Sequence, residues 1–365
     1  MSGPSVDDPD PSYEGWVEAA HRARSDIFEG RGDLDPIDLD DAATFLAALL
    51  EGSLQFLHGD PAQPAFIPWV TPTRRWMDNG RDSLYSIAAV DGDHRYRITG
   101  RRGDECYLSF TLYAGDPGHP QRVVSNVNHR DLAVGHGDGY ALELDPPGDA
   151  CYVIRRQYLH QPQTQTPGTT GIEVVAGSGD PASGPQSPGA TESDRWQAAT
   201  GFLTAMTRRP ATGGPTPPWV STTANEMGDP SRWDPSHGGG RGTPDQVYAM
   251  GPYELGPGEA LVMDVRFPDC AYASAALWNR FSQTVDARFH RSTINHRQAV
   301  PSPDGSTRVV VAHRDPGTPN WLATGGRRRG SVFWRFLLAE HAPPPIESRV
   351  AGLDEVRSAG RPDAR

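Results

Sequence analysis

Residues 309–314 read Val-Val-Val-Ala-His-Arg, and this run decides the fold class. Successive side chains of a β-strand point to opposite faces, so His313 shares one face with the first and third valines, and Arg314 shares the other with the second valine and the alanine. Both faces are therefore apolar, which is typical of a strand inside a sandwich. The polar end of this strand is expected at a rim, where pockets in such folds often open.

Similar strand-like runs lie on both sides of this segment. They alternate in polarity or run apolar, and turns rich in Asp, Gly and Pro separate them. In the first half they span 96–99, 106–113, 140–144 and 152–155, and in the second half 260–267, 272–278, 289–294, 307–312 and 331–339. Short strands at regular intervals predict antiparallel β-sandwiches, so we expect a mainly β protein.

Apolar residues at helical spacing occur outside the predicted strands. Residues 12–29 and 38–58 predict a pair of packed helices, and Asp38 is placed to favour a helix start. Residues 194–208 predict a further helix. The expected fold class is thus two antiparallel β-sandwich domains with an N-terminal helical pair and a helical insertion.

Composition divides the chain into six predicted parts. Residues 161–192 are dense in Gln, Thr, Pro, Gly and Ser, which predicts a flexible linker, and the polar residues 343–365 predict a disordered tail. Trp219 and Trp233 lie in a Pro- and Gly-rich passage, where we expect them to anchor the core rather than stack on a ligand. The parts are a disordered N-terminus with the helical pair (1–62), a first sandwich (63–160), the linker (161–192), a helical and irregular insertion (193–250), a second sandwich (251–342) and the tail (343–365).

The charged residues exclude several classes of function. All 34 basic residues are Arg, since the sequence contains no Lys, and this excludes Schiff-base catalysis, pyridoxal-phosphate anchoring and the lysine-dependent phosphate sites of nucleotide-binding proteins and kinases. The net charge of -12 and the pI near 5.4 argue against nucleic-acid and anionic-membrane binding, because both need a basic surface. We therefore expect no nucleic-acid partner and no membrane partner.

The cysteines and the N-terminal residues indicate in which cellular compartment the protein is expected. Cys106, Cys151 and Cys270 are odd in number and lack CxxC spacing, so we expect buried free thiols rather than disulfides, a zinc site or a reactive nucleophile. Residues 1–13 have neither a basic start nor an apolar core, which predicts no signal peptide. The longest apolar run, 42–50, is too short to cross a bilayer, so a cytoplasmic protein is expected.

The second half of the chain carries several motifs of one family. They are Trp278-Asn279, Asn295, Asp304-Gly305, His313-Arg314-Asp315-Pro316-Gly317, Asn320-Trp321-Leu322 and Phe333-Trp334-Arg335-Phe336. In these motifs the chain resembles the uncharacterised family called domain of unknown function 1214. An earlier stretch, Asp82-Ser83-Leu84-Tyr85 with 90–92, 96–98 and 100–103, is similar to the N-terminal half of actinobacterial members, which in other branches is a companion domain numbered 1254.

The resemblance covers about residues 70–340 and implies paired β-sandwich or jelly-roll-like domains with helical additions. It implies no reaction. Two positions depart from the family pattern. Gly80-Arg81-Asp82 stands where the family usually has Asn-Pro-Asp, so no Asn acts at position 80, and Ala323 stands where many members have Pro.

Histidines and an Asp-Tyr pair supply candidates for catalysis. We predict His290 and His313 to be general acids or bases, because imidazole titrates near neutrality. The alternatives are a metal site that also uses His296, or structural imidazoles; the chain has no His-x-His, no HExxH and no aspartate-rich calcium loop, so we expect no metal. Asp82 and Tyr85 either polarise a substrate group or form an architectural pair at a strand start.

The predicted substrate-binding set consists of arginines and of amide and indole side chains: Arg291, Arg314, Arg335, Asn279, Asn295, Asn320 and Trp321. The arginines can clamp a carboxylate or phosphate, or they pair with nearby acids. The Asn-Trp pair that follows the Pro-Gly turn is either a ligand wall or a lock that ties down the loop.

Together these residues predict an enzyme of hydrolase or lyase type, which acts on a small anionic or oxygen-rich metabolite by acid–base and electrostatic catalysis without a cofactor. The chain has no GxSxG, no SxxK, no Walker loop and no GxGxxG after a strand. The alternative is a noncatalytic small-molecule-binding protein, or an assembly protein whose Arg-rich rim pairs with another copy in a homo-oligomer. The enzyme hypothesis requires His290, His313, Arg314 and Arg335 to line one hollow.

Overall fold

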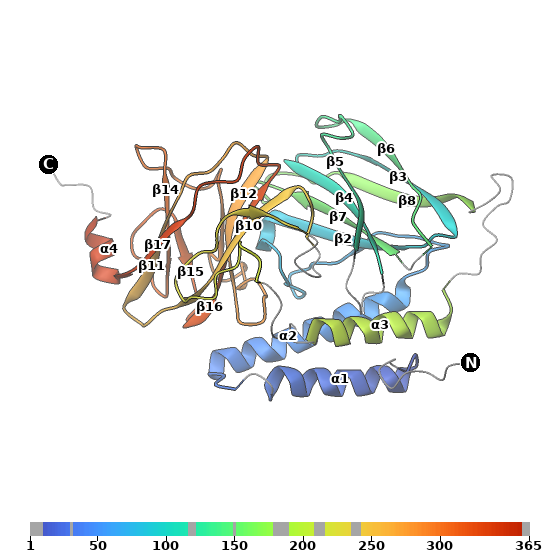
Figure 1. Ribbon diagram of the computed structural model, residues 1–365, viewed down its shortest axis with the longest axis horizontal. Coiled ribbons are helices and arrows are strands. Elements are labelled where there is room, and N and C mark those ends of the chain that lie inside the picture. The colour runs from blue at the N-terminus through green and yellow to red at the C-terminus, as the bar shows by residue number, and fades with distance from the viewer. Residues whose placement is uncertain are drawn as a thin grey trace.

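The chain folds into two β-sandwiches that lie side by side, with three helices along one side of them (Figure 1). The computed structural model describes residues 10–29, 32–115, 122–148, 151–177, 190–207, 216–234 and 242–359. The predicted fold class, mainly antiparallel sandwiches with a helical pair and a helical insertion, is confirmed. Within those ranges no helix combines the length and the apolar character needed to span a bilayer.

The helices on this side are α1 (Tyr13–Phe28), α2 (Pro36–Leu54), the 3₁₀ turn η1 (Gln55–His58) and α3 (Glu192–Thr207). The α2 helix begins where Asp35 caps it. The Asp35 carboxylate accepts hydrogen bonds from the backbone N–H groups of Ile37 and Asp38, both at 2.9 Å, and Pro36 fits the first turn because it has no N–H to satisfy. The third helix packs against the other two, and its Phe202 contacts Trp69 and Trp76 below the first sandwich.

The first sandwich consists of a five-stranded and a three-stranded antiparallel sheet. The five-stranded sheet has the order β1 (Ile67–Pro68), β2 (Ser83–Val90), β7 (Cys151–Tyr158), β4 (Tyr107–Ala114) and β5 (Arg122–Asn128). The other sheet has the order β6 (Gly139–Leu144), β3 (His94–Arg101) and β8 (Thr169–Gly177). Ile98, Phe110 and Val153 are buried between these sheets, as the alternating pattern of the strands predicts.

The second sandwich consists of a five-stranded and a four-stranded sheet. The five-stranded sheet has the order β13 (Thr293–Asn295), β12 (Tyr272–Trp278), β16 (Arg329–Leu337), β10 (Gln246–Glu254) and β9 (Ser231–Arg232). The other sheet has the order β15 (Trp321–Ala323), β14 (Thr307–Ala312), β11 (Glu259–Val265) and β17 (Glu347–Gly352), in which only the β14–β15 pair is parallel.

Strand β14 has two buried faces, as its sequence predicts. Val309 and Val311 point into the second sandwich, and Val310 and Ala312 pack under the short helix α4 (Leu353–Ala359). All four side chains are fully buried. The helix therefore explains why the outer face of this strand is apolar.

Three local predictions were wrong. The predicted linker contains β8, which pairs with β3 and whose Ile172 and Val174 pack against the first core. These β-branched residues favour a strand, although the composition of 161–192 as a whole does not. The linker residues 178–189 lie outside the described residues. The predicted tail contains β17 and α4, which bury Ala351 and Val356. Residues 289–292 are not part of a strand, because the backbone N–H groups of 289 and 290 close a turn on the carbonyl of Asp286.

The two five-stranded sheets face each other across an interdomain layer. Along β4, Leu108 and Phe110 point into the first core, whereas Tyr107 and Tyr113 point the other way and bond to the segment that leads into β10. From the second sandwich, Tyr272 contributes a ring whose centroid lies 4.9 Å from that of Tyr158. The layer is thus rich in phenol groups on both sides.

Candidate functional site between the sandwiches

Arg335 lies at the centre of the interdomain layer. Strand β16 places it opposite the first sandwich, where one Nη donates to the hydroxyls of both Tyr85 and Tyr158 and the other donates to the Met77 carbonyl at 3.2 Å. Its side chain also lies over the rings of Phe333 and Tyr158, at 5.1 and 5.7 Å from their centroids. Only 4% of Arg335 is exposed, and it forms no ion pair with a carboxylate among the described residues, although its charge acts from a longer distance to lower the pKa of the buried Asp78 carboxyl.

A buried guanidinium without a carboxylate must be stabilised by hydrogen bonds and ring faces. Burial raises the pKa of the Tyr158 phenol well above its usual value, so this hydroxyl stays protonated. Tyr85 and Tyr158 also share a hydrogen bond between their hydroxyls. The Tyr85 and Tyr158 hydroxyls thus lie together against a fixed positive charge, an arrangement suited to an anionic group.

Asp82 provides a carboxyl group in the same layer. The 3₁₀ turn η2 (Gly80–Asp82) delivers it to the start of β2, where one carboxylate oxygen accepts from the Tyr272 hydroxyl at 2.8 Å and from Asn295 Nδ2 at 2.7 Å. Burial raises the Asp82 pKa to about 6, although the hydrogen bonds from Asn295 and Tyr272 oppose this rise. A carboxyl group that titrates near neutrality can serve as a general acid or base.

These groups form one connected set, which we call the interdomain cluster: Asp82, Tyr85, Tyr158, Tyr272, Asn295 and Arg335. The Tyr272 ring joins its two halves, because Tyr272 contacts the Tyr158 ring and its hydroxyl bonds to Asp82. Four members, Asp82, Tyr85, Asn295 and Arg335, belong to the set predicted from the sequence. The structure brings these four together from widely separated positions in the chain.

Two histidines border the cluster at Asn295. The rings of His160 and His296 lie 5.0 Å apart, and His160 stacks on Tyr272 at 5.9 Å. Asn295 Nδ2 also donates to the His160 backbone carbonyl at 2.9 Å. Burial lowers the pKa of both imidazoles, that of His160 to about 4, so both rings are neutral near pH 7.

Several of these residues could not be selected from the sequence. Tyr158, Tyr272 and His160 were not predicted as site residues, and neither was Asp78, whose buried carboxyl has a pKa raised to about 6 and accepts a hydrogen bond from Thr284. The available signal was the placement of tyrosines on strand faces opposite to core residues. That signal does not by itself distinguish a domain contact from a solvent-exposed face.

The structure does not bring the other predicted residues to this cluster. His313, at the rim beyond β14, bonds to Thr324 Oγ1 at 2.7 Å and to the Leu255 carbonyl at 3.2 Å. His290 is half-buried in the turn after Asp286. Within the described residues no hydrogen bond, ion pair or ring contact joins either histidine to Arg335, so the structure does not bring these predicted residues together.

The remaining predicted residues make local contacts within loops. Arg291 and Arg314 are exposed, and each donates to a backbone carbonyl, that of Pro319 at 2.6 Å and that of Pro257 at 3.4 Å. The Trp321 indole donates to the Ala312 carbonyl at 3.1 Å. These hydrogen bonds hold neighbouring segments together at the rim of the second sandwich.

The two other predicted amides hold turns. Asn279 Oδ1 accepts from the backbone N–H groups of Phe281 and Gln283, at 2.9 and 3.0 Å. Asn320 donates to the carbonyls of Val300 and Arg308 and accepts from the Val300 N–H, all within 2.9 Å. Of the two alternatives for Asn320, its contacts are those of a loop lock.

The thiols and the possible metal ligands were also located. Burial raises the pKa of Cys106 to about 12 and that of Cys270 to about 11, so both thiols are protonated near neutral pH. Cys151 is buried and forms no disulfide, and its thiol donates to the Pro147 carbonyl at 3.9 Å. No three His, Cys, Asp or Glu side chains come together in a metal-holding arrangement within the described ranges.

A cavity of about 510 Å³ opens beside the interdomain layer at the edge strand β5. Its lining includes Asn126, Asn128, Trp233 and Asp245. The Asp245 carboxylate accepts from Asn126 at 2.7 Å and from the Tyr107 hydroxyl at 2.8 Å, and the Tyr107 ring lies 5.8 Å from that of Tyr158. One side chain therefore separates this cavity from the cluster.

The fold is similar to that of an uncharacterized bacterial protein of known structure. An uncharacterized protein from Burkholderia cenocepacia has a TM-score of 0.78 and 25% sequence identity, over 94% of this chain and 97% of that one. The VPA0106 protein of Vibrio parahaemolyticus has a TM-score of 0.45 and 12% identity, over 90% of this chain and 100% of that one. No family model and no curated protein matches this sequence.

Proposed function

We propose that the chain is an enzyme of hydrolase or lyase type, which acts on a small anionic or oxygen-rich metabolite through acid–base and electrostatic catalysis in the interdomain layer. Asp82 carries the proton, and the Tyr272 hydroxyl and the Asn295 amide position its carboxyl group. Arg335 with Tyr85 and Tyr158 stabilises negative charge on the substrate. A bound carboxylate or phosphate takes over the hydrogen bonds that Arg335 now donates to the two phenols.

One observation carries this proposal: a carboxyl group with a pKa of about 6 lies in the same buried cluster as a guanidinium that forms no ion pair with a carboxylate among the described residues and interacts with the Asp78 carboxyl only at longer range. Both features cost free energy, because burying a charged group removes it from water. Apolar residues of similar size would fill a layer that only holds the two domains together without this cost. If the cluster only holds the two sandwiches together, replacing its residues is expected to leave any enzymatic activity unchanged.

We also propose membership of the family called domain of unknown function 1214, in its actinobacterial branch. The motif residues Asp82, Tyr85, Asn295 and Arg335 lie far apart in the sequence and meet in one cluster, as expected for residues retained by a shared site. A cytoplasmic location is part of the same proposal. The proton-transfer roles of His290 and His313 stay predictions, and their loop positions give them no support.

The test uses purified full-length protein and a panel of short hydroxy acids, acyl esters and phosphate monoesters. Binding is screened by thermal shift, and turnover of each binder is followed by proton NMR. We expect Asp82→Asn to lower turnover by roughly a hundredfold or more while binding is kept, and Arg335→Met to weaken binding.

One control variant separates this effect from general damage to the fold. Asp304→Asn changes an exposed carboxylate in the Asp304-Gly305 turn and is expected to leave both readouts unchanged. Unchanged turnover in Asp82→Asn refutes the catalytic proposal. Binding without any product in the wild-type protein supports the noncatalytic small-molecule-binding alternative instead.

A further inference from the structure

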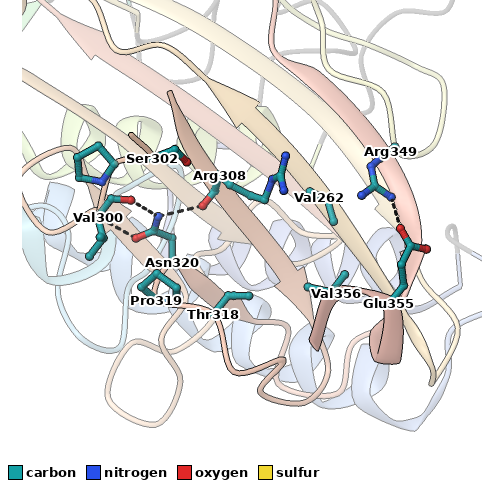
Figure 2. A pocket seen from close by; sticks show the side chains of 11 residues that line it. Val262, Val300, Ser302, Arg308, Thr318, Pro319, Asn320, Arg349, Glu355 and Val356 are labelled. Atoms are coloured by element: carbon teal, nitrogen blue, oxygen red, sulfur yellow. Dashed lines mark hydrogen bonds and ion pairs between the residues drawn. The ribbon is translucent and has the colours of Figure 1, made fainter. Parts of the chain in front are cut away.

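A second cavity, of about 180 Å³, lies on the outer side of the second sandwich, away from the interdomain layer. Figure 2 shows the loop residues 300–302 and 318–320 at one end and Arg349 with Glu355 at the other, with the Arg308 guanidinium extending between them. The cavity thus lies between this loop region and α4, over strands β11 and β14. No residue of the interdomain cluster lines it.

The floor and walls of this cavity are apolar and held in place. Val262 from β11 and Val356 from α4 are both at least nine-tenths buried and form part of the floor. At the loop end, the Asn320 amide ties the backbone of Val300 to that of Arg308 (Figure 2). Because these hydrogen bonds fix the loop against the strand, the cavity is formed before any ligand arrives.

The charged lining carries an excess of one positive charge, since it contains Arg308, Arg349 and Glu355. Arg308 pairs through Nε and Nη2 with Asp264, at 2.9 Å each, and no hydrogen bond from its Nη1 is found among the described residues. Arg349 uses only Nη1 to reach Glu355, at 3.0 Å. A guanidinium has five N–H donors, so both arginines retain donors for a further acceptor.

A polar atom in the wall also lacks a partner. The Thr318 hydroxyl oxygen is buried and has no hydrogen-bond partner within the described part of the chain. An unpaired buried hydroxyl is costly unless water or a ligand satisfies it. This oxygen is closed to a water-sized probe and so does not face the cavity, and the groups that a ligand meets there are the two arginines and the apolar lining.

We propose that this cavity binds a short monocarboxylic acid with an apolar tail. The carboxylate accepts from Arg308 and Arg349, and the tail packs on Val262 and Val356. The volume corresponds to about six molecules of liquid water, which suits an acid of roughly six carbons. The site is separate from the proposed catalytic layer and does not depend on it.

The experiment titrates the full chain with hexanoate and with its neutral isostere hexanamide, using calorimetry and saturation-transfer NMR. We expect saturable binding of one hexanoate per chain. Removing the charge of the ligand, in hexanamide, or the charge of one arginine, in Arg349→Gln, is expected to raise the dissociation constant by about tenfold. Arg266→Gln serves as the matched control, because Arg266 is an equally exposed arginine in an ion pair, with Asp304, outside the cavity.

Thermal unfolding of each variant confirms that it is folded before titration. A second variant, Val356→Ala, tests the tail contact, since it is expected to weaken hexanoate binding while a shorter acid, acetate, is little affected. The proposal is overturned if hexanoate does not saturate, if hexanamide binds equally well, or if Arg349→Gln and Arg308→Gln both bind hexanoate like the wild-type protein.

Discussion

Replacing Asp82 with Asn is expected to change how stability depends on pH. The folded-state pKa of Asp82 is raised from 3.8 to about 6, mainly because burial disfavours the charged carboxylate. The raised pKa of Asp82 therefore contributes to the free energy of unfolding in full below about pH 3.8, and this contribution is lost as the pH rises through about 6. The shift of roughly two pKa units corresponds to about 3 kcal/mol of unfolding free energy.

About 2 kcal/mol of this change is expressed between about pH 4.5 and about pH 7.5, a range in which many proteins can be studied. Asn has nearly the same shape as Asp and keeps an oxygen that accepts from Tyr272 and Asn295, but it carries no charge at any pH. We therefore expect the stability of Asp82→Asn, relative to wild type, to increase by about 2 kcal/mol across this range.

The assay is urea or guanidinium unfolding, followed by tryptophan fluorescence, at a series of pH values for both proteins. Asp78→Asn should show a change of the same sign, because burial also raises the Asp78 pKa to about 6. Asp304→Asn should not, since hydrogen bonds from Ser306 lower the Asp304 pKa. If the difference in unfolding free energy between wild type and Asp82→Asn stays constant with pH, Asp82 has an ordinary pKa. The argument for its proton-transfer role would then fail.

Three further perturbations test the local structure. Asn320→Ala removes three buried hydrogen bonds to the backbone and should lower the unfolding free energy by about 2 to 4 kcal/mol, measured by urea unfolding; a loss below about 0.5 kcal/mol would contradict the loop lock. Asp35→Ala removes the α2 cap and should cost about 1 kcal/mol in the same assay, whereas an unchanged midpoint would mean that the cap contributes nothing. Cys106 should react with a thiol reagent at neutral pH far more slowly in the folded chain than in urea, because burial raises its pKa to about 12; equal rates, read by mass spectrometry, would contradict this burial.

Much of the fold follows from local pattern. The run 309–314 is apolar on both faces, and the structure buries one face in the sandwich core and the other under α4. The N-terminal helices follow from apolar spacing, with Asp35 and Pro36 at the start of α2. These features are predictable because each depends on neighbours within a few residues.

Strand β8 and the elements after residue 343 were missed for one physical reason. The segment 169–177 contains strand-forming residues, Ile172, Val174 and Val175, but it lies in a stretch rich in Gln, Thr, Pro, Gly and Ser, and its pairing with β3, about 75 residues earlier, provides the hydrogen bonds and the buried contacts that order it. The pairing of β17 with β11 is equally distant in sequence. Such long-range pairings cannot be inferred from local propensity.

The residue types of the site were visible in the sequence, but their grouping was not. Asp82, Tyr85, Asn295 and Arg335 were selected as candidates, together with residues that turned out to hold loops. Arg335 and Tyr85 are 250 positions apart and meet only because two separate sheets pack face to face. Sequence alone determined the strands, the helices and the supply of polar side chains, since these are set by short-range alternation and capping. The tertiary structure decided which polar groups share a buried layer, because the docking of two sandwiches depends on contacts that no local pattern encodes.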